Sequence, residues 1–247
     1  MTAPAAAHAG SATPAGSATP AGSAPRPAFL QPHFESMGAQ QEAGKLGLWL
    51  FLASEVLFFT GLFTAYGVYR ANHPDLFAYA QHFLDWRMGA LNTAVLVTSS
   101  LSAAWSVRAA QRGDRRTLLR TLVLTFLLAG AFMVVKYFEY SHKLAHGVGW
   151  GASCQPDAAF LAELPEAVHA LPVPGRLGTF FAVYYLMTGL HGIHVLVGMG
   201  LYAWLVVRAR RDHFGPGYYG PVDSVALYWH LVDVIWIFLF PLFYLIG

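Results

Sequence analysis

One acidic residue, Glu55, lies in the middle of an apolar stretch, where a charged group is costly to bury. On a helix its neighbours at i−4, i+3 and i+4 are Phe51, Phe58 and Phe59, none of which can pair with a carboxyl group. We therefore expect its partner to come from another helix. A desolvated carboxyl of this kind can exchange protons, or it can be a protonated structural group that fixes helix pairing. The residues leave both interpretations open.

Two histidines, His191 and His194, follow three residues apart in a second apolar stretch, with Gly189 and Gly192 beside them. This spacing places both imidazoles on one face of a helix, and the small residues would allow another helix to approach closely. Two imidazoles do not complete a metal site, which commonly needs three or four ligands. His230 in a later stretch is a candidate third ligand, and it is also a candidate partner of either histidine in binding a haem.

His230 is itself followed three residues later by Asp233, so a hydrogen bond along one helix face is sterically natural. That pair could relay protons or simply neutralise itself. Asn92 and Ser99 lie seven residues apart in another apolar stretch, and this spacing suits hydrogen bonds between helices.

A third group of charges, Lys136, Glu139 and Lys143, has the i+3 and i+4 spacing of helical ion pairs. The group lies near the end of its apolar stretch, where long side chains can extend to the membrane interface. We expect these residues to be structural.

The composition explains why these polar residues are noteworthy. Of 247 residues, 56% are hydrophobic and 11% are charged, with a formal net charge of +2, which does not favour a nucleic-acid partner. The single cysteine, Cys154, cannot form an intramolecular disulfide or a cysteine-based metal site by itself. Five stretches have the length and apolarity of membrane spans. They are residues 45–69, 88–107, 118–140, 177–207 and 222–246. The predicted fold is an all-α membrane protein, a five-helix transmembrane bundle.

Basic residues in short loops are retained on the cytoplasmic side of a membrane. They are concentrated in the connections between the second and third stretches and between the fourth and fifth stretches. These residues are Arg108, Arg112, Arg115, Arg116, Arg120, Arg208, Arg210 and Arg211. The distribution predicts a cytoplasmic N-terminus and a periplasmic C-terminus.

Residues 1–44 are rich in alanine, proline, glycine and serine, and a Gly-Ser-Ala-Thr-Pro-Ala unit repeats from Gly10 to Ala24. Such a composition predicts a flexible tail preceding a transmembrane domain at 45–247. The tail has the features of neither a secretory signal nor a transit peptide, which favours the inner (plasma) membrane of a bacterium.

Five segments resemble, in order, the helices of cytochrome c oxidase subunit III, a family of the haem-copper oxidases. The resemblance extends from Lys45 to Gly247. The segments are Leu48–Phe59; Leu91–Thr93 with Ser99 and Ser100; Lys136–Tyr140; Thr188–Val195 with Gly198; and Tyr228–Trp236 with Phe240 and Pro241.

The resemblance implies an accessory subunit that carries no catalytic, haem-binding or copper-binding residue itself. Such a subunit docks on oxidase subunit I and supports reduction of dioxygen to water, coupled to proton translocation, with cytochrome c as the electron donor. Haem and copper belong to the partner subunits, and structural phospholipids are expected. By position, Glu55 matches the family's buried, carbodiimide-reactive glutamate. Other matching intramembrane polar positions are Glu139, His191, His194, His230 and Asp233.

One feature departs from the commonest, seven-helix form of the family: no apolar stretch precedes Lys45. The chain resembles the short five-helix form, and we expect a subunit I with additional helices to replace the missing wall of a lipid-filled cleft. Three alternatives remain: a subunit associated with nitric oxide reductase, a proton-coupled transporter, and a membrane cytochrome b.

Overall fold

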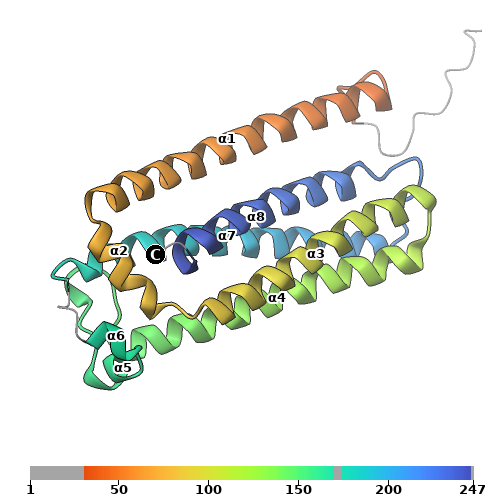
Figure 1. The fold of residues 1–247 in the computed structure, drawn as a ribbon. Helices are drawn as coiled ribbons and strands as arrows, with labels where there is room; N and C mark the ends of the chain where they lie inside the picture. The colour runs from red at the N-terminus through yellow and green to blue at the C-terminus, as the bar shows by residue number, and fades with distance from the viewer. Residues whose placement is uncertain (1–30, 170–173, 246–247) are drawn as a thin grey trace, which may run out of the picture. The chain divides into compact units, whose positions relative to one another are not determined.

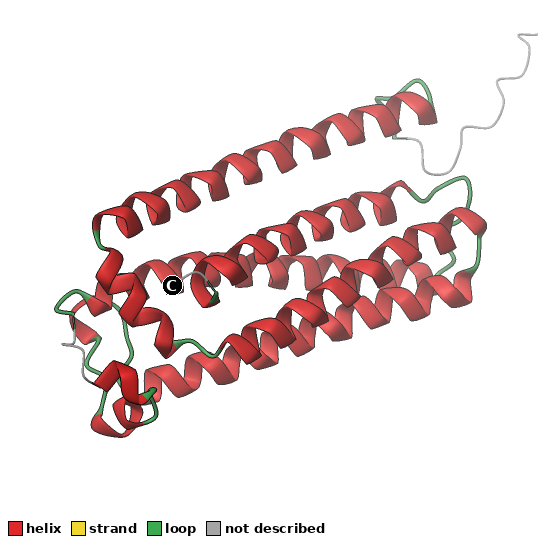
Figure 2. Ribbon diagram, viewed as in Figure 1, coloured by secondary structure: helices red, strands yellow, loops and turns green. Residues whose placement is uncertain are grey.

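The computed structural model describes residues 31–169 and 174–245. The chain divides into two compact units, Met1–Glu42 and Ala43–Gly247. Five helices are long and apolar enough to cross a membrane: α1 (Met37–Asn72), α3 (Trp86–Arg112), α4 (Arg115–Ala145), α7 (Leu177–Arg210) and α8 (Gly220–Tyr244). The described residues contain no β-strand (Figure 2). The prediction of an all-helical protein with five candidate spans is confirmed.

The first helix begins earlier than expected. The sequence placed residues up to 44 in a flexible tail, whereas the structure has helix from Met37 onward. Residues 31–36 lead into it, and the Ser36 hydroxyl accepts a hydrogen bond from the backbone N–H of Ala39 (3.1 Å), which satisfies one otherwise free donor of the first turn. Residues 1–30 of the predicted tail lie outside the described residues.

Short capping interactions set the ends of α3 and α4. The Asp85 carboxylate accepts from the N–H of Arg87 (2.8 Å) at the start of α3, and Asp114 accepts from Thr117 (3.1 Å) at the start of α4. Gly113, with φ of 70°, ends α3 in the left-handed conformation that glycine adopts without strain. The turn between these helices is therefore tight, and the helices are antiparallel neighbours.

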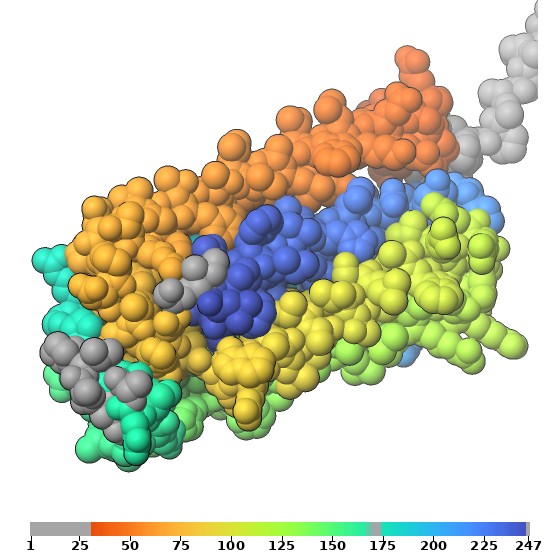
Figure 3. Space-filling view, in the orientation of Figure 1, coloured from red at the N-terminus to blue at the C-terminus, as the bar shows by residue number. Residues whose placement is uncertain are grey.

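Within the second unit, α3, α4, α7 and α8 form a closed ring in which α3 contacts α4 and α8, and α7 contacts the same two helices (Figure 1). The largest fully buried side chains are mainly aromatic, including Trp229, Trp236, Tyr184 and Tyr202. Helix α1 is packed least: 11% of its most apolar window is buried, against 50% for α8. From residue 43 onward, many of its side chains stand free along one flank (Figure 3).

The connections at one end of the ring are structured. Helices α2 (Pro74–Ala80) and η1 (Gln81–Phe83) join α1 to α3, while η2 (Gly151–Ser153), α5 (Ala158–Ala162) and α6 (Glu166–His169) lie between α4 and α7. We call this the loop end. The sequence showed these connections as polar, yet Phe77, Phe83 and Phe160 are buried there.

Asp157 organises part of the loop end. Its carboxylate accepts from the N–H of Phe160 (2.7 Å), which caps α5, and bonds to the imidazole of His146 (3.0 Å). These two hydrogen bonds, the first contributing most, hold the pKa of Asp157 below its ordinary value.

The opposite end, which we call the basic end, brings together the α3–α4 turn and the α7–α8 connection. Arg115 forms an ion pair with Asp212 (2.8 Å) and donates to the backbone carbonyl of Arg210 (2.6 Å). The two arginine-rich connections of the sequence therefore share one end of the bundle.

The packing of α7 against α8 requires a glycine at position 198. A Cβ atom at Gly198 would lie 2.5 Å from the indole ring of Trp229, a fully buried side chain. At Gly200, two residues further along the same helix, a Cβ atom would meet no atom of the structure within 4 Å. An alanine substitution at each of these two glycines therefore distinguishes the effect of packing on stability from the effect of helix propensity.

We expect Gly198→Ala to destabilise the protein by about 1–3 kcal/mol, the usual cost of overpacking a core. Gly200→Ala should be neutral or slightly stabilising, because alanine favours helix. Unfolding of both purified variants in mild detergent measures the difference. Equal stability of the two variants would contradict this packing.

Candidate functional site

The hydrogen-bond partner of Glu55 on α1 lies on α7, and the sequence had led us to expect a partner on another helix. Its Oε2 atom lies 2.8 Å from Nε2 of His194, and both side chains are about one-fifth exposed. The other ring nitrogen of His194, Nδ1, lies 2.8 Å from the backbone carbonyl of Leu190. A carbonyl only accepts hydrogen bonds, so Nδ1 carries a hydrogen.

The chemistry of the pair follows from that tautomer. Nε2 of His194 either accepts a hydrogen bond from a neutral Glu55 or, as part of an imidazolium, donates a hydrogen bond to the carboxylate. One proton is therefore shared between two groups with two possible positions. This arrangement can exchange a proton or hold α1 against α7, and the two roles are compatible.

Aromatic residues surround the pair. The ring of Phe59 meets His194 edge-on, with centroids 5.2 Å apart, and the Tyr228 hydroxyl of α8 donates to the His194 carbonyl (2.9 Å). Phe51 of α1 contacts Tyr228 in turn. Helices α1, α7 and α8 thus meet at Glu55 and His194.

His191 does not join this pair. It is fully buried and lies against Phe132 of α4 and Trp236 of α8, with ring centroids 5.6 and 5.3 Å away. Neither of its ring nitrogens has a hydrogen-bond partner among the described residues. Although the two imidazoles are three residues apart, one faces α1 and the other faces the ring interior.

The helix approach expected at the glycines beside these histidines is not observed. A Cβ atom at either Gly189 or Gly192 would meet no described atom within 4 Å. The physical reason is that α4 and α8 pack on the neighbouring face of α7, the face that carries His191. The two glycines border an apolar cavity of about 230 Å³ between α7 and α4 instead.

The predicted pairing of His230 with Asp233 does not form. Nδ1 of His230 lies 2.6 Å from the hydroxyl of Ser100, across the interface between α8 and α3. Asp233 is 3% exposed, and its carboxylate has no hydrogen bond of standard geometry among the described residues, although Ser100 lies close to it. The second helix competes successfully for the imidazole, because the serine is placed directly opposite it.

Hydrogen bonds between helices were predicted for both Asn92 and Ser99, and the structure shows one for Ser99 only. Ser99 accepts a hydrogen bond from the indole N–H of Trp229 (2.9 Å), which is the interhelical contact that the spacing predicted. Asn92 is fully buried, and its amide has no hydrogen-bond partner among the described residues.

The densest polar group is a charge cluster that we define as Lys136, Glu139 and Lys143 of α4. The Lys136 ammonium donates to Oε2 of Glu139 (2.9 Å), and the Lys143 ammonium donates to Oε1 (2.7 Å). All three side chains are at most 6% exposed. The expected ion pairs form, and the lysine side chains are buried within the protein.

Two tyrosines explain why the charge cluster can be buried. The hydroxyls of Tyr184 on α7 and Tyr244 on α8 donate to Oε1 of Glu139 at 2.8 and 2.7 Å. Both hydroxyls also lie within hydrogen-bonding distance of Lys136, at 3.0 and 3.1 Å, and its ammonium lies 5.3 Å from the centroid of Trp236. Sequence analysis missed these tyrosines, which a search for hydroxyl-bearing aromatic residues within the spans would have found.

No group of three or more histidine, cysteine, aspartate or glutamate side chains is arranged to hold a metal ion within residues 31–169 and 174–245. His191, His194 and His230 are directed to different neighbours, so they do not complete one another as ligands.

Comparison with known proteins gives this geometry its context. Residues 33–152 and 175–247 match the family model described as cytochrome c oxidase subunit III. The chain belongs to the cytochrome c oxidase subunit III family. The family resemblance predicted from the five ordered segments is confirmed.

Relatives within the cytochrome c oxidase subunit III family come from bacteria and animals. The chain is 31% identical over 201 residues to the probable cytochrome c oxidase subunit 3 of Mycobacterium bovis, covering 81% of this chain and 87% of that protein. It is 30% identical over 213 residues to cytochrome c oxidase subunit 3 of Loxodonta africana, covering 84% of this chain and 71% of that protein.

We expect the charge cluster of this subunit III to depend on charge balance. Glu139→Gln leaves two buried ammonium groups without a counter-ion and should cost about 3–5 kcal/mol. Lys136→Met leaves a one-to-one pair of Lys143 with Glu139 and should cost markedly less. Thermal unfolding in mild detergent ranks the variants. A Lys136→Met protein as unstable as Glu139→Gln would contradict the argument.

The Glu55–His194 bond should stabilise the position of α1. Glu55→Leu leaves a ring nitrogen of His194 unpaired and should cost about 1–3 kcal/mol, whereas Glu55→Gln keeps a donor and should cost less. Thr60→Val is the control, since the Thr60 hydroxyl bonds only to its own helix, at the Val56 carbonyl. Unfolding measurements in detergent compare the three. Equal effects of the leucine and glutamine variants would exclude a stabilising hydrogen bond.

Proposed function

We propose that this chain is an accessory, non-catalytic subunit of a haem-copper cytochrome c oxidase. In this role it supports reduction of dioxygen to water coupled to proton translocation, while haem and copper are bound by partner subunits. The observation that carries the proposal is the match to the family model over residues 33–152 and 175–247. The arrangement of polar groups supports it, because most of them bond to a neighbouring helix of this chain.

Subunit I is the proposed main partner, and cytochrome c is the proposed electron donor to the complex. The free flank of α1 supports a partner or lipid at that face: Trp49 and Leu57 are 61% and 72% exposed. A subunit I with additional helices would cover this flank in the five-helix form.

Glu55 and His194 are the proposed proton-exchanging pair, supported by the single proton that the two groups share. His191, His230 and Glu139 are proposed to hold the helices of the bundle in place, His191 by ring packing and the other two by hydrogen bonds. Asp233, whose carboxylate has no hydrogen-bond partner among the described residues, is a further proposed proton or lipid position. The fully bonded carboxylate of Glu139 supports a structural role for that residue.

The proposed location is the inner membrane of a bacterium, with the N-terminus in the cytoplasm and the C-terminus in the periplasm. The basic end supports this orientation, because Arg115 and Arg210 place two arginine-rich connections together. A reporter enzyme that is active only in the periplasm should therefore be active when it is fused after Gly247.

Affinity purification of the tagged chain in mild detergent tests the proposed function. We expect recovery of a haem-copper catalytic subunit, a haem signal in the reduced-minus-oxidised spectrum, and oxygen consumption with reduced cytochrome c. Recovery of a nitric-oxide-reducing subunit would support the runner-up instead. A colourless chain recovered alone, and active in proton-coupled uptake after reconstitution, would contradict the oxidase role and favour a transporter.

A further inference from the structure

Several polar side chains buried in the ring of four helices have no hydrogen-bond partner among the described residues. They are Asn92, His191, Tyr202 and Asp233, and each is at most 3% exposed. They come from α3, α7 and α8. A polar group that is enclosed without a hydrogen bond destabilises a protein, so a group of them within one bundle requires an explanation.

Two of these side chains, Tyr202 of α7 and Asp233 of α8, approach each other. The two helices are antiparallel and make a close contact where Gly198 meets Trp229. Tyr202 lies one turn beyond Gly198, and Asp233 lies one turn beyond Trp229 in the opposite direction. Because side chains lean toward the N-terminus of their own helix, both lean back toward this contact. The Tyr202 ring meets the Trp229 ring edge-on, with centroids 5.4 Å apart, and the Tyr202 hydroxyl interacts electrostatically with Asp233.

The Tyr202 hydroxyl and the Asp233 carboxyl group nevertheless do not bond to each other. The hydroxyl and both carboxyl oxygens have no hydrogen-bond partner among the described residues. A polar contact that exceeds hydrogen-bonding distance is typical of two groups bridged by water. A buried water makes about three hydrogen bonds, and the two carboxyl oxygens and the hydroxyl offer that number of positions.

A serine connects Asp233 to a side chain that is not fully buried. Ser100 of α3 lies close to Asp233, and its hydroxyl lies 2.6 Å from Nδ1 of His230. His230 is partly exposed, in contrast to Asp233. A hydroxyl can donate to one neighbour and accept from another. Ser100 can therefore link the buried carboxyl group to the imidazole of His230.

We propose that one ordered water molecule binds inside the ring and bridges the Asp233 carboxyl group and the Tyr202 hydroxyl. Ser100 extends this hydrogen-bonded line to His230. Polar residues within membrane spans commonly face a hydrated interior of this kind. The line is separate from the Glu55–His194 pair. The proposal does not rest on the oxidase role, because every group that binds the water belongs to this chain.

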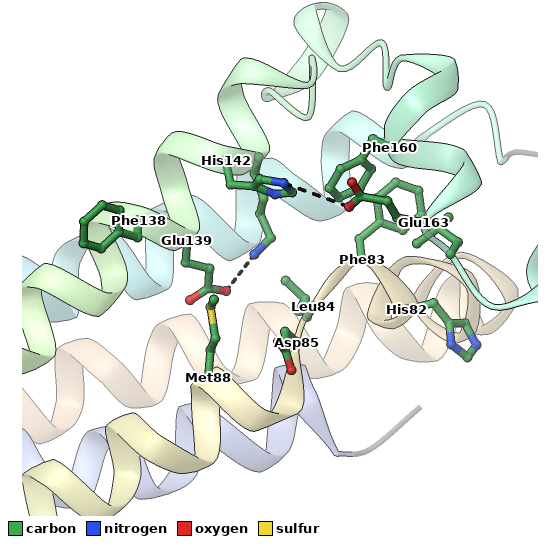
Figure 4. A pocket seen from close by; sticks show the side chains of 12 residues that line it. His82, Phe83, Leu84, Asp85, Met88, Phe138, Glu139, His142, Phe160 and Glu163 are labelled. Carbon is green, nitrogen blue, oxygen red and sulfur yellow. Dashed lines mark hydrogen bonds and ion pairs between the residues drawn. The ribbon is translucent and has the colours of Figure 1, made fainter.

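Tyr184, on the same helix as Tyr202, provides a matched comparison. Both tyrosines are 0% exposed, but the Tyr184 hydroxyl donates to Glu139. The Glu139 carboxylate also accepts from the ammonium of Lys143 (Figure 4). The hydroxyl of Tyr184 is thus satisfied by protein groups. A property that differs between these two tyrosines therefore reports on bound water and not on burial.

X-ray radiolytic labelling of the purified complex, in water enriched in a heavy oxygen isotope, tests the proposal without a substitution. X-rays convert bound water to hydroxyl radicals in place, and these radicals oxidise the neighbouring side chain. We expect Tyr202 to be oxidised several times faster than Tyr184, with the added oxygen carrying the isotope. Equal protection of the two tyrosines would overturn the proposal.

Tyr202→Phe gives an independent test, because a dry site and a hydrated site predict opposite effects. Removal of an unsatisfied hydroxyl from a dry interior raises the unfolding temperature, whereas removal of a hydroxyl that bonds to water lowers it. We expect the unfolding temperature in mild detergent to fall, as it should for Tyr184→Phe. An unchanged or higher unfolding temperature of Tyr202→Phe would contradict the proposal.

A second substitution tests whether Asp233 binds the same water. In an Asp233→Leu background the water loses its carboxyl partner, so Tyr202→Phe should no longer lower the unfolding temperature. Thr60→Val on α1 is the control background, since the Thr60 hydroxyl bonds to its own helix, and there Tyr202→Phe should act as in the wild type. An equal decrease in both backgrounds would show that Tyr202 and Asp233 do not share a water molecule.

Discussion

The ring of four helices depends on the ion pairs and hydrogen bonds that the Glu139 carboxylate accepts. It is the shared anion of Lys136 and Lys143, and it accepts hydrogen bonds from hydroxyl groups on α7 and α8. A buried charge is tolerated only when its partners satisfy it completely, and here three helices supply those partners. The position of α4 is thereby coupled to Tyr184 and Tyr244, and a rotation of α7 or α8 would remove a hydrogen bond from the buried carboxylate.

The carboxyl group of Glu55 has fewer partners than that of Glu139. Among the described residues its hydrogen-bond partner is His194, and both groups are partly exposed. The two acidic residues therefore differ in their bonding: Glu139 is held by several donors, whereas Glu55 is partly exposed and bonds to a single imidazole among the described residues. The carboxyl group with fewer partners thus lies on the helix that is packed least, α1.

The sequence predicted the helices well because a bilayer imposes a length and a composition that are visible along the chain. It also required Glu55 to bond to another helix, since its helical neighbours are phenylalanines. It could not identify His194 as that partner, or Ser100 as the partner of His230, because a tertiary contact between helices leaves no periodic signal. The same limit explains the burial of Lys136: the tyrosine hydroxyls that make it possible lie 48 and 108 residues away.

Helix α1 shows how a short bundle can depend on molecules beyond its own chain. Many of its apolar side chains, such as Leu57, are exposed, and this surface is stable only against lipid or another helix. Its contacts with α7 and α8 include the Glu55–His194 bond, the hydrogen bond from the Tyr66 hydroxyl to the Leu242 carbonyl, and a row of aromatic residues from Phe51 to Tyr66. Because the Glu55 and His194 side chains are themselves partly exposed, anything that packs on the exposed side of α1 near them would alter the surroundings of this hydrogen bond.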